Sequence, residues 1–198
     1  MPAALSPPQP RTDNGDFPPT KKWTREECEA LEQAGLVGVR DYELIEGVLV
    51  QKTGKKLLHI RALSRLIQWL VFTFESKVVP EPGIDVAPVD NPTSQPEPDV
   101  VVLRASVVEL VDTIRSRDIR MVAEVSDTTL SFDLGPKARL YARAGIEEYW
   151  VLDVNGRRLI VHQQPETGEY RSIQAFAEDE TVQTPLTGEA TIVVRELL

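Results

Sequence analysis

Residues 98–126 read PDVVVLRASVVELVDTIRSRDIRMVAEVS and contain two short apolar runs. One carboxylate directly precedes the first run, and another lies within the second. The first run, Val100 to Leu103, is apolar at every position, which is typical of a central strand covered on both faces. Asp99 stands directly before it. The second run, Met121 to Ser126, alternates with a period of two, so Glu124 interrupts an otherwise apolar strand. These two runs predict neighbouring buried strands that carry acidic groups.

Helices are predicted on both sides of this stretch. Apolar residues at helical spacing indicate a long core helix from Leu58 to about Glu75. Capping-box patterns predict a helix from Thr24 to about Ala34 and another from Ser106 towards Arg117. A further helix is expected from Lys137 to Ala144, with Asp133 as its cap residue and Gly145 at its end.

The remaining β-rich runs are bounded by proline, glycine and asparagine. Asn155-Gly156 separates two of them and is a strong signal for a hairpin. The expected strands are Glu43 to Gln51, Val78 to Val89, Glu148 to Val154, Arg158 to Gln163, Tyr170 to Gln174 and Ala190 to Val194.

Length and composition indicate one ordinary globular domain. The chain has 198 residues, of which 41% are hydrophobic and 27% charged. Residues 1–20 are rich in proline and poor in large apolar groups, so we expect a disordered tail followed by a single domain over residues 21–198. The longest apolar stretch is far shorter than the roughly 20 residues that a membrane span needs. One cysteine, Cys28, and no secretory leader favour a cytoplasmic protein.

The charge balance argues against a protein that coats nucleic acid by bulk electrostatics. The chain has 22 basic and 31 acidic residues, and its formal net charge is −9. An enzyme that contacts DNA locally is still compatible with this charge.

Three acids, Asp99, Glu124 and Glu46, fall in β segments where a carboxylate is costly to bury. Any one of them taken singly could meet an arginine or cap a turn. Taken together, they form the oxygen donor set that Mg²⁺ or Mn²⁺ prefers. Such a site is suited to hydrolysis of phosphodiesters, because the metal activates water and neutralises charge on the phosphate.

An ordered set of short motifs resembles a known family. Its members here are Tyr42-Glu43-Leu44-Ile45-Glu46-Gly47, His59, Pro98-Asp99, Glu124-Val125-Ser126, Asp133-(x3)-Lys137-(x3)-Tyr141-Ala142 and Gly145-Ile146-Glu147-Glu148-Tyr149-Trp150. Together they resemble the "putative restriction endonuclease" family, a bacterial branch of the PD-(D/E)XK nuclease superfamily, over about residues 24–175. The resemblance implies an α/β (α+β) restriction-endonuclease-like fold, with a central mixed β-sheet flanked by α-helices, and DNA cleavage that depends on Mg²⁺ or Mn²⁺.

The resemblance also implies roles for individual residues. Asp99 matches the first acid of the motif and Glu124 the second, and the carbonyl of Val125 is the expected third metal ligand. Glu46 matches an upstream acid that supports the metal. The usual motif lysine, two residues after Glu124, is replaced here by Ser126.

Related enzymes supply the missing amine from the neighbouring helix, and Lys137 is the matching residue. Its expected role is to orient the attacking water and to stabilise charge in the transition state. Cleavage of both strands of a duplex requires two such sites, which favours a homodimer.

A basic set that precedes and begins the long helix is a candidate DNA contact. A solvated turn and an ordinary helix start are the competing interpretations. Its members are Lys55, Lys56, His59 and Arg61.

Two rival hypotheses remain open from the sequence. One is a catalytically silent nuclease-fold module that binds DNA or a protein partner, and the Ser126 replacement and the acidic charge favour it. The other is an antiparallel-sheet protein that binds a small ligand and has structural acids. A separation of Asp99 from Glu124 by more than about 8 Å would favour the latter, because two ligands of one metal must lie close together.

Overall fold

The computed structural model describes residues 20–36, 38, 41–52, 54 and 56–198. The tail expected for residues 1–20 therefore lies outside the described residues except for Thr20. The helices are α1 (Arg25–Gln33), α2 (Leu57–Phe74), α3 (Leu130–Phe132) and α4 (Ala138–Arg143), and a π-helical turn, η6 (Asp133–Lys137), joins α3 to α4. None of the described helices is long and apolar enough to cross a membrane.

The main sheet has six strands in the order β10-β9-β8-β7-β5-β3. β7 and β8 run parallel, whereas the other neighbouring pairs are antiparallel, so the sheet is mixed. Its strands are β3 (Val78–Pro80), β5 (Val100–Leu103), β7 (Ile119–Ser126), β8 (Glu148–Asp153), β9 (Arg158–Glu166) and β10 (Glu169–Ala177).

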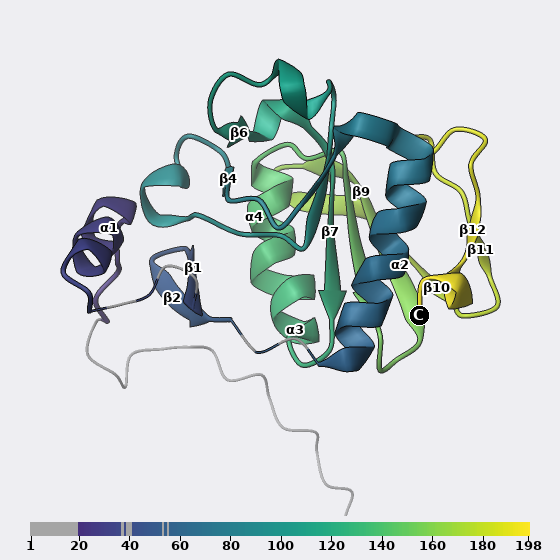
Figure 1. Cartoon of the computed structure of the whole chain (residues 1–198), viewed down its shortest axis with the longest axis horizontal. Helices are drawn as coiled ribbons and strands as arrows, with labels where there is room; N and C mark the ends of the chain where they lie inside the picture. Colours follow the sequence, from purple (N-terminus) through teal and green to yellow (C-terminus); the bar gives the residue numbers. More distant parts are fainter. Residues whose placement is uncertain (1–19, 37, 39–40, 53, 55) are drawn as a thin grey trace, which may run out of the picture.

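Three two-stranded sheets lie around the main sheet, namely β1 with β2, β4 with β6, and β11 with β12. Their strands are β1 (Tyr42–Ile45), β2 (Val48–Gln51), β4 (Ile84–Asp85), β6 (Ile114–Arg115), β11 (Thr181–Val182) and β12 (Ile192–Val193). The β1–β2 hairpin and α1 lie on one side of the molecule, and β11 and β12 lie on the opposite side (Figure 1).

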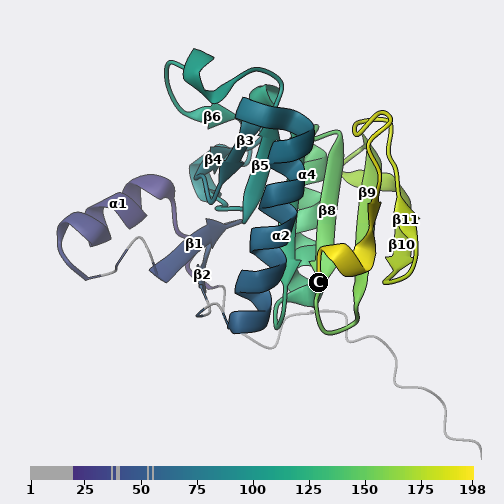
Figure 2. The ribbon, with the colours of Figure 1, turned by 45° about the vertical axis from the view of Figure 1, so that its right-hand side comes forward.

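One helix covers each face of the main sheet (Figure 2). The buried positions of α2, such as Leu66 and Leu70, pack with Met121, Ala123 and Val125 of β7. On the other face, Ala138, Tyr141 and Ala142 pack with β-strand residues that include Val122, Val101 and Tyr149. The predicted alternation along β7 is confirmed, and it places Glu124 on the face that α4 covers.

Three predicted elements differ from the structure. The strand expected from Val78 to Val89 is two short strands, β3 and β4, in different sheets, because Pro82 and Gly83 interrupt the run between them. Glu43 to Gln51 is a hairpin and not one strand, because Glu46 and Gly47 form a tight turn in which both residues have positive φ, +50° and +80°. The helix predicted from Ser106 is only a short 3₁₀ turn, Val107–Glu109, although its capping box is present. The residues that follow are extended and reach β6, which pairs with β4, so sheet pairing outweighs the local cap.

Candidate active site

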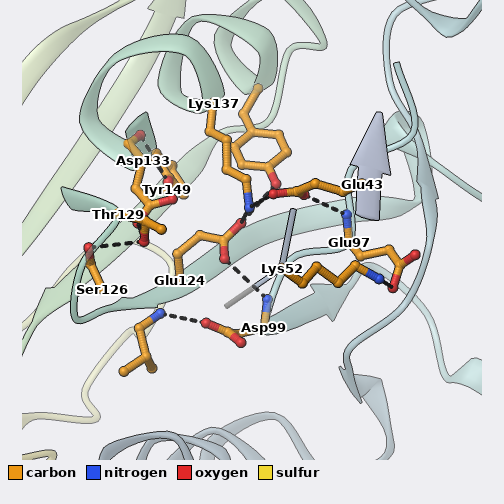
Figure 3. Close-up of polar contacts among 12 residues, drawn as sticks. Glu43, Lys52, Glu97, Asp99, Glu124, Ser126, Thr129, Asp133, Lys137 and Tyr149 are labelled. Carbon is orange, nitrogen blue, oxygen red and sulfur yellow. Dashed lines mark hydrogen bonds and ion pairs between the residues drawn. The ribbon is translucent and has the colours of Figure 1, made fainter. Parts of the chain in front are cut away.

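The strand register brings the two motif acids together. Val100 of β5 pairs with Ala123 of β7, so Asp99 lies beside Glu124 and Val125 at the end of β5. The Asp99 backbone N–H donates to Glu124 Oε2 over 3.4 Å, and the Val125 N–H donates to Asp99 Oδ2 over 2.8 Å (Figure 3). This proximity contradicts the hypothesis of an antiparallel-sheet protein whose acids are far apart.

Lys137 reaches the same carboxylate from the helical side. Its Nζ lies 2.9 Å from Glu124 Oε1. Lys137 ends the π-helical turn η6, which contains Pro136. Proline has no N–H to complete the α-helical ladder, and a widened π turn satisfies the backbone around it. The sequence therefore builds a local bulge that ends at Lys137, close to β7.

Ser126 occupies the position of the usual motif lysine and is fully buried. Its Oγ lies 3.5 Å from Thr129 Oγ1, and the Thr129 hydroxyl donates to Asp133 Oδ2 over 2.7 Å. The expectation that Asp133 caps the helix is wrong, because the helical path already begins at Leu130. Asp133 is instead a buried acid in the π turn, held by Thr129.

A residue that the sequence interpretation missed, Glu43, completes the pairing of Lys137. Glu43 Oε1 lies 3.0 Å from Lys137 Nζ, and its Oε2 accepts the backbone N–H of Glu97 over 3.3 Å. Glu43 comes from β1 and is buried. The sequence signal that could have identified Glu43 is Glu46-Gly47, because a turn at these residues leaves Glu43 on the strand and Glu46 off it.

Glu46 is not brought to the other acids. It lies in the hairpin turn, where its Oε1 pairs with Arg143 Nη2 over 2.6 Å. The inward strand face that the sequence suggested for Glu46 is therefore wrong, because the two turn residues break the alternation on which that interpretation rested.

Tyr141 adds a neutral donor to the cluster. Its hydroxyl donates to Glu124 Oε1 over 3.0 Å, one turn beyond Lys137 on the same helix. Glu124 Oε1 thus faces both an ammonium and a phenol, and Figure 3 shows the carboxylate of Glu124 between Lys137 and Asp99.

The electrostatics of the cluster follow from one buried cation among several acids. Burial raises the pKa of Glu124 to about 8; Lys137 opposes this rise, while the carboxylates of Asp99, Asp133 and Glu43 add to it. Burial also raises the pKa of Asp133. For Lys137, burial acts to lower the pKa, but the surrounding carboxylates outweigh it and hold the pKa above its ordinary value. The lysine therefore keeps its charge at neutral pH, and the buried acids around it outnumber the one buried cation of the cluster.

Of the basic set, two members lie at the acids. His59 Nε2, from the first turn of α2, lies 3.4 Å from Asp99 Oδ1. Lys56 Nζ lies 3.1 Å from Asp127 Oδ2. Arg61 is exposed on α2 and does not line the cavity described below. Lys55 lies outside the described residues.

A cavity of about 690 Å³ opens onto Asp99, Glu124 and Lys137. Val125, His59 and Glu43 also line it, and the residues on its walls come from β2, the segment before β5 and the turn before α3. Acidic and lysine side chains dominate this lining.

The donor set fits a hard divalent cation, although it is not a complete cage. Among the residues that the structure describes, no group of three or more His, Cys, Asp and Glu side chains is arranged to hold a metal. The two adjacent carboxylates of Asp99 and Glu124 are oxygen donors, and Mg²⁺ commonly binds one or two carboxylates and takes its other ligands from water and phosphate. The excess of buried acid over cation, seen in the raised pKa of Glu124, also favours a bound cation.

A mixed sheet with one helix layer on each face, and with an acid pair and a lysine at the end of its central strands, defines the restriction-endonuclease-like fold. The family model described as "Uma2: Putative restriction endonuclease" matches residues 26–194. The chain therefore belongs to this family, as its motifs predicted.

A solved structure supports the fold. The crystal structure of "a putative nuclease belonging to DUF820" from Anabaena variabilis aligns with a TM-score of 0.63 and 15% sequence identity. The alignment covers 84% of this chain and 94% of that one. No curated protein matches the chain.

Proposed function

We propose that this protein is a divalent-metal-dependent endonuclease that hydrolyses phosphodiester bonds in DNA. The observation that carries the proposal is the position of Lys137, whose Nζ lies 2.9 Å from Glu124 although no lysine follows Glu124 on its strand. An acid pair can hold a divalent metal, and an adjacent ammonium can stabilise charge that develops on the phosphate. Family membership supports the same reaction class.

Asp99, Glu124 and the carbonyl of Val125 would hold Mg²⁺ or Mn²⁺. When bound, the metal would lower the pKa of a water molecule and offset negative charge that develops on the scissile phosphate. We assign the supporting acid role to Glu43 in place of Glu46, because Glu43 contacts Lys137 while Glu46 pairs with Arg143.

Lys137 serves the reaction as a charged hydrogen-bond donor. Because the carboxylates around it hold its pKa above the ordinary value, it keeps its proton at neutral pH and is not a general base. Glu43 and Glu124 fix the ammonium from two sides. So held, the ammonium orients the attacking water and stabilises the charge of the transition state.

His59 and Lys56 are the members of the basic set placed to contact a phosphate near the acids. Arg61, which does not line the cavity, is proposed as a more distant DNA contact. Lys55 stays a proposed DNA contact from the sequence alone, because it lies outside the described residues. Cleavage of one strand needs one copy of the site, whereas cleavage of both strands of a duplex needs two copies and hence a homodimer.

The test is cleavage of labelled DNA oligonucleotides by wild type and by Asp99→Asn, each with Mn²⁺, Mg²⁺ or a chelator. We expect cleavage by wild type that requires metal and that falls by about 10²-fold or more in the variant. Cleavage that survives in Asp99→Asn would show a contaminating nuclease or another site.

A silent module that binds DNA or a protein partner is the second candidate. The acidic lining of the cavity favours the form that binds a basic protein partner, because carboxylates attract basic side chains and repel the phosphates of DNA. Metal-dependent cleavage by wild type that Asp99→Asn loses would exclude a silent module.

A further inference from the structure

The groups proposed to act on the substrate lie at the base of a recess. Asp99 is 7% exposed, and Glu124 and Lys137 are each 5% exposed. The cavity above them has a volume of about 690 Å³, which lies within the range of small-molecule pockets. A scissile phosphate must therefore enter the recess, and a rod as wide as a base-paired duplex could contact only its mouth.

One wall of the recess, the β1–β2 hairpin, is held firmly against the body. Ile45 and Val50 pack with Leu140 of α4. The Gln95 N–H donates to the Leu44 carbonyl and the Gly47 N–H donates to the Thr93 carbonyl, each over 2.7 Å. These contacts tie the C-terminal half of β1 and the turn after it to the chain segment before β5.

The guanidinium of Arg25 fixes that segment in turn. It donates to Asp85 Oδ1 over 2.5 Å, to Asn91 Oδ1 over 3.2 Å and to the Ser94 carbonyl over 2.8 Å. Opening this wall to admit a duplex would break several part-buried polar bonds at once, which is costly.

The charges around the mouth also oppose a long polyanion. Two lysines there already face carboxylates: Lys52 Nζ lies 2.6 Å from Glu97, and Lys56 Nζ lies 3.1 Å from Asp127. Among the described residues that line the cavity, four acids are at least partly exposed, against two such lysines, Lys52 and Lys56. These acids are Asp41, Glu81, Glu97 and Asp127, whereas the other acids of the lining are buried at the base. A duplex carries one charge per about 1.7 Å of its axis, so laying it across this mouth would bring many phosphates near carboxylates.

We infer that the substrate is single-stranded DNA, either free or as an overhang, and that base-paired DNA is excluded. The inference rests on the proposed function and names the substrate class of the same site. A single strand is thinner and less densely charged than a duplex, and can feed one phosphate at a time into the recess. One copy of the site then suffices for each cut.

The experiment compares one labelled sequence in four forms with Mn²⁺: single-stranded DNA, blunt duplex, duplex with a single-stranded overhang, and single-stranded RNA. We expect the DNA single strand to be cut at least about tenfold faster than the blunt duplex, with cuts in the overhang and none in its paired part. Equal or faster cleavage of the blunt duplex, or cleavage of RNA alone, would overturn the inference.

The two proposals fail in distinguishable ways. Duplex cleavage that needs metal and Asp99 would leave the proposed function standing and overturn the inference. Absence of cleavage on all four substrates would overturn the proposed function, and the inference with it.

A pair of variants tests the charge argument separately. Glu97→Gln removes a carboxylate at the mouth and releases Lys52 from its ion pair. Glu166→Gln is the control, because it breaks the ion pair of Glu166 with Arg171 on the β9–β10 hairpin, and neither residue lines the cavity. We expect Glu97→Gln to lower KM for the single strand by about threefold or more, and Glu166→Gln to leave it unchanged. Equal KM values in the two variants would contradict the role of mouth charge.

Discussion

Replacement of Lys137 by methionine, which has a similar length and no charge, should separate turnover from metal binding. Turnover should fall by about 10²-fold or more, because the ammonium that orients water and stabilises charge is lost. Asp99 and Glu124 remain, so calorimetry should still detect Mn²⁺ binding. Turnover within about threefold of wild type would remove Lys137 from the mechanism.

The same variant has a calculable cost in stability. Lys137 lies 2.9 Å from Glu124 and 3.0 Å from Glu43, and all three side chains are buried. Removing one partner of a buried pair costs about 3–5 kcal/mol, and we expect the lower end because Glu124, whose pKa is already about 8, can stay protonated. Urea unfolding in a chelator measures this free energy.

Lys52→Met is the matched control for stability. Lys52 also pairs with a carboxylate, at 2.6 Å from Glu97, but its side chain is 27% exposed. Its loss should cost about 1 kcal/mol or less. Equal losses in the free energy of unfolding for the two lysine variants would refute the argument that burial makes the Lys137 pair more stabilising. Mn²⁺ at 100 times its Kd should add about 2.7 kcal/mol to the stability of Lys137→Met, since the metal binds only the folded chain.

Further outcomes follow from the same cluster. Burial raises the pKa of Glu124 to about 8, so a proton competes with the metal for this carboxylate. The apparent Kd for Mn²⁺ should therefore rise about tenfold for each pH unit below 8. A Kd that calorimetry finds independent of pH would contradict this. Glu43→Gln should lower turnover by about tenfold or more, because Glu43 contacts Lys137. Glu46→Gln breaks only the half-exposed pair with Arg143 and should leave turnover within about twofold of wild type. Equal effects of the two variants on turnover would support a role for Glu46 in the site. Tyr141→Phe removes a buried hydrogen bond to Glu124 and should lower the free energy of unfolding in urea by about 1–3 kcal/mol. An unchanged free energy of unfolding would show that this hydrogen bond does not stabilise the fold.

Sequence patterns predicted the central strands and flanking helices well, because those elements are long or strongly periodic. The alternation in Met121 to Ser126 and the helical spacing from Leu58 both reflect packing on one face, and the structure has that packing. The helix expected after Ser106 failed because a cap can start a turn but cannot extend it when the next residues pair in a sheet.

The site was predictable where a motif fixed both residue and element. Asp99 and Glu124 are adjacent because two buried strands pair, and Lys137 reaches them because Pro136 lies in a π turn. Glu43 was not predictable while the alternation of one continuous strand was used to place Glu46 inward. The two-residue turn ends β1 before Glu46, and Glu43 is buried because both faces of β1 are covered.

The most direct test of the proposed metal centre is Mn²⁺ calorimetry on wild type, Asp99→Asn and Glu124→Gln. A single-stranded oligonucleotide with non-hydrolysable linkages is included, so that a site completed by substrate is also detected. Asp153→Asn is the control, because Asp153 is equally buried but pairs with Arg158 and does not line the cavity. The proposal predicts binding in wild type and Asp153→Asn, and binding at least about tenfold weaker in the other two variants. Absence of binding in folded wild type, or unchanged binding in Asp99→Asn and Glu124→Gln, would contradict it.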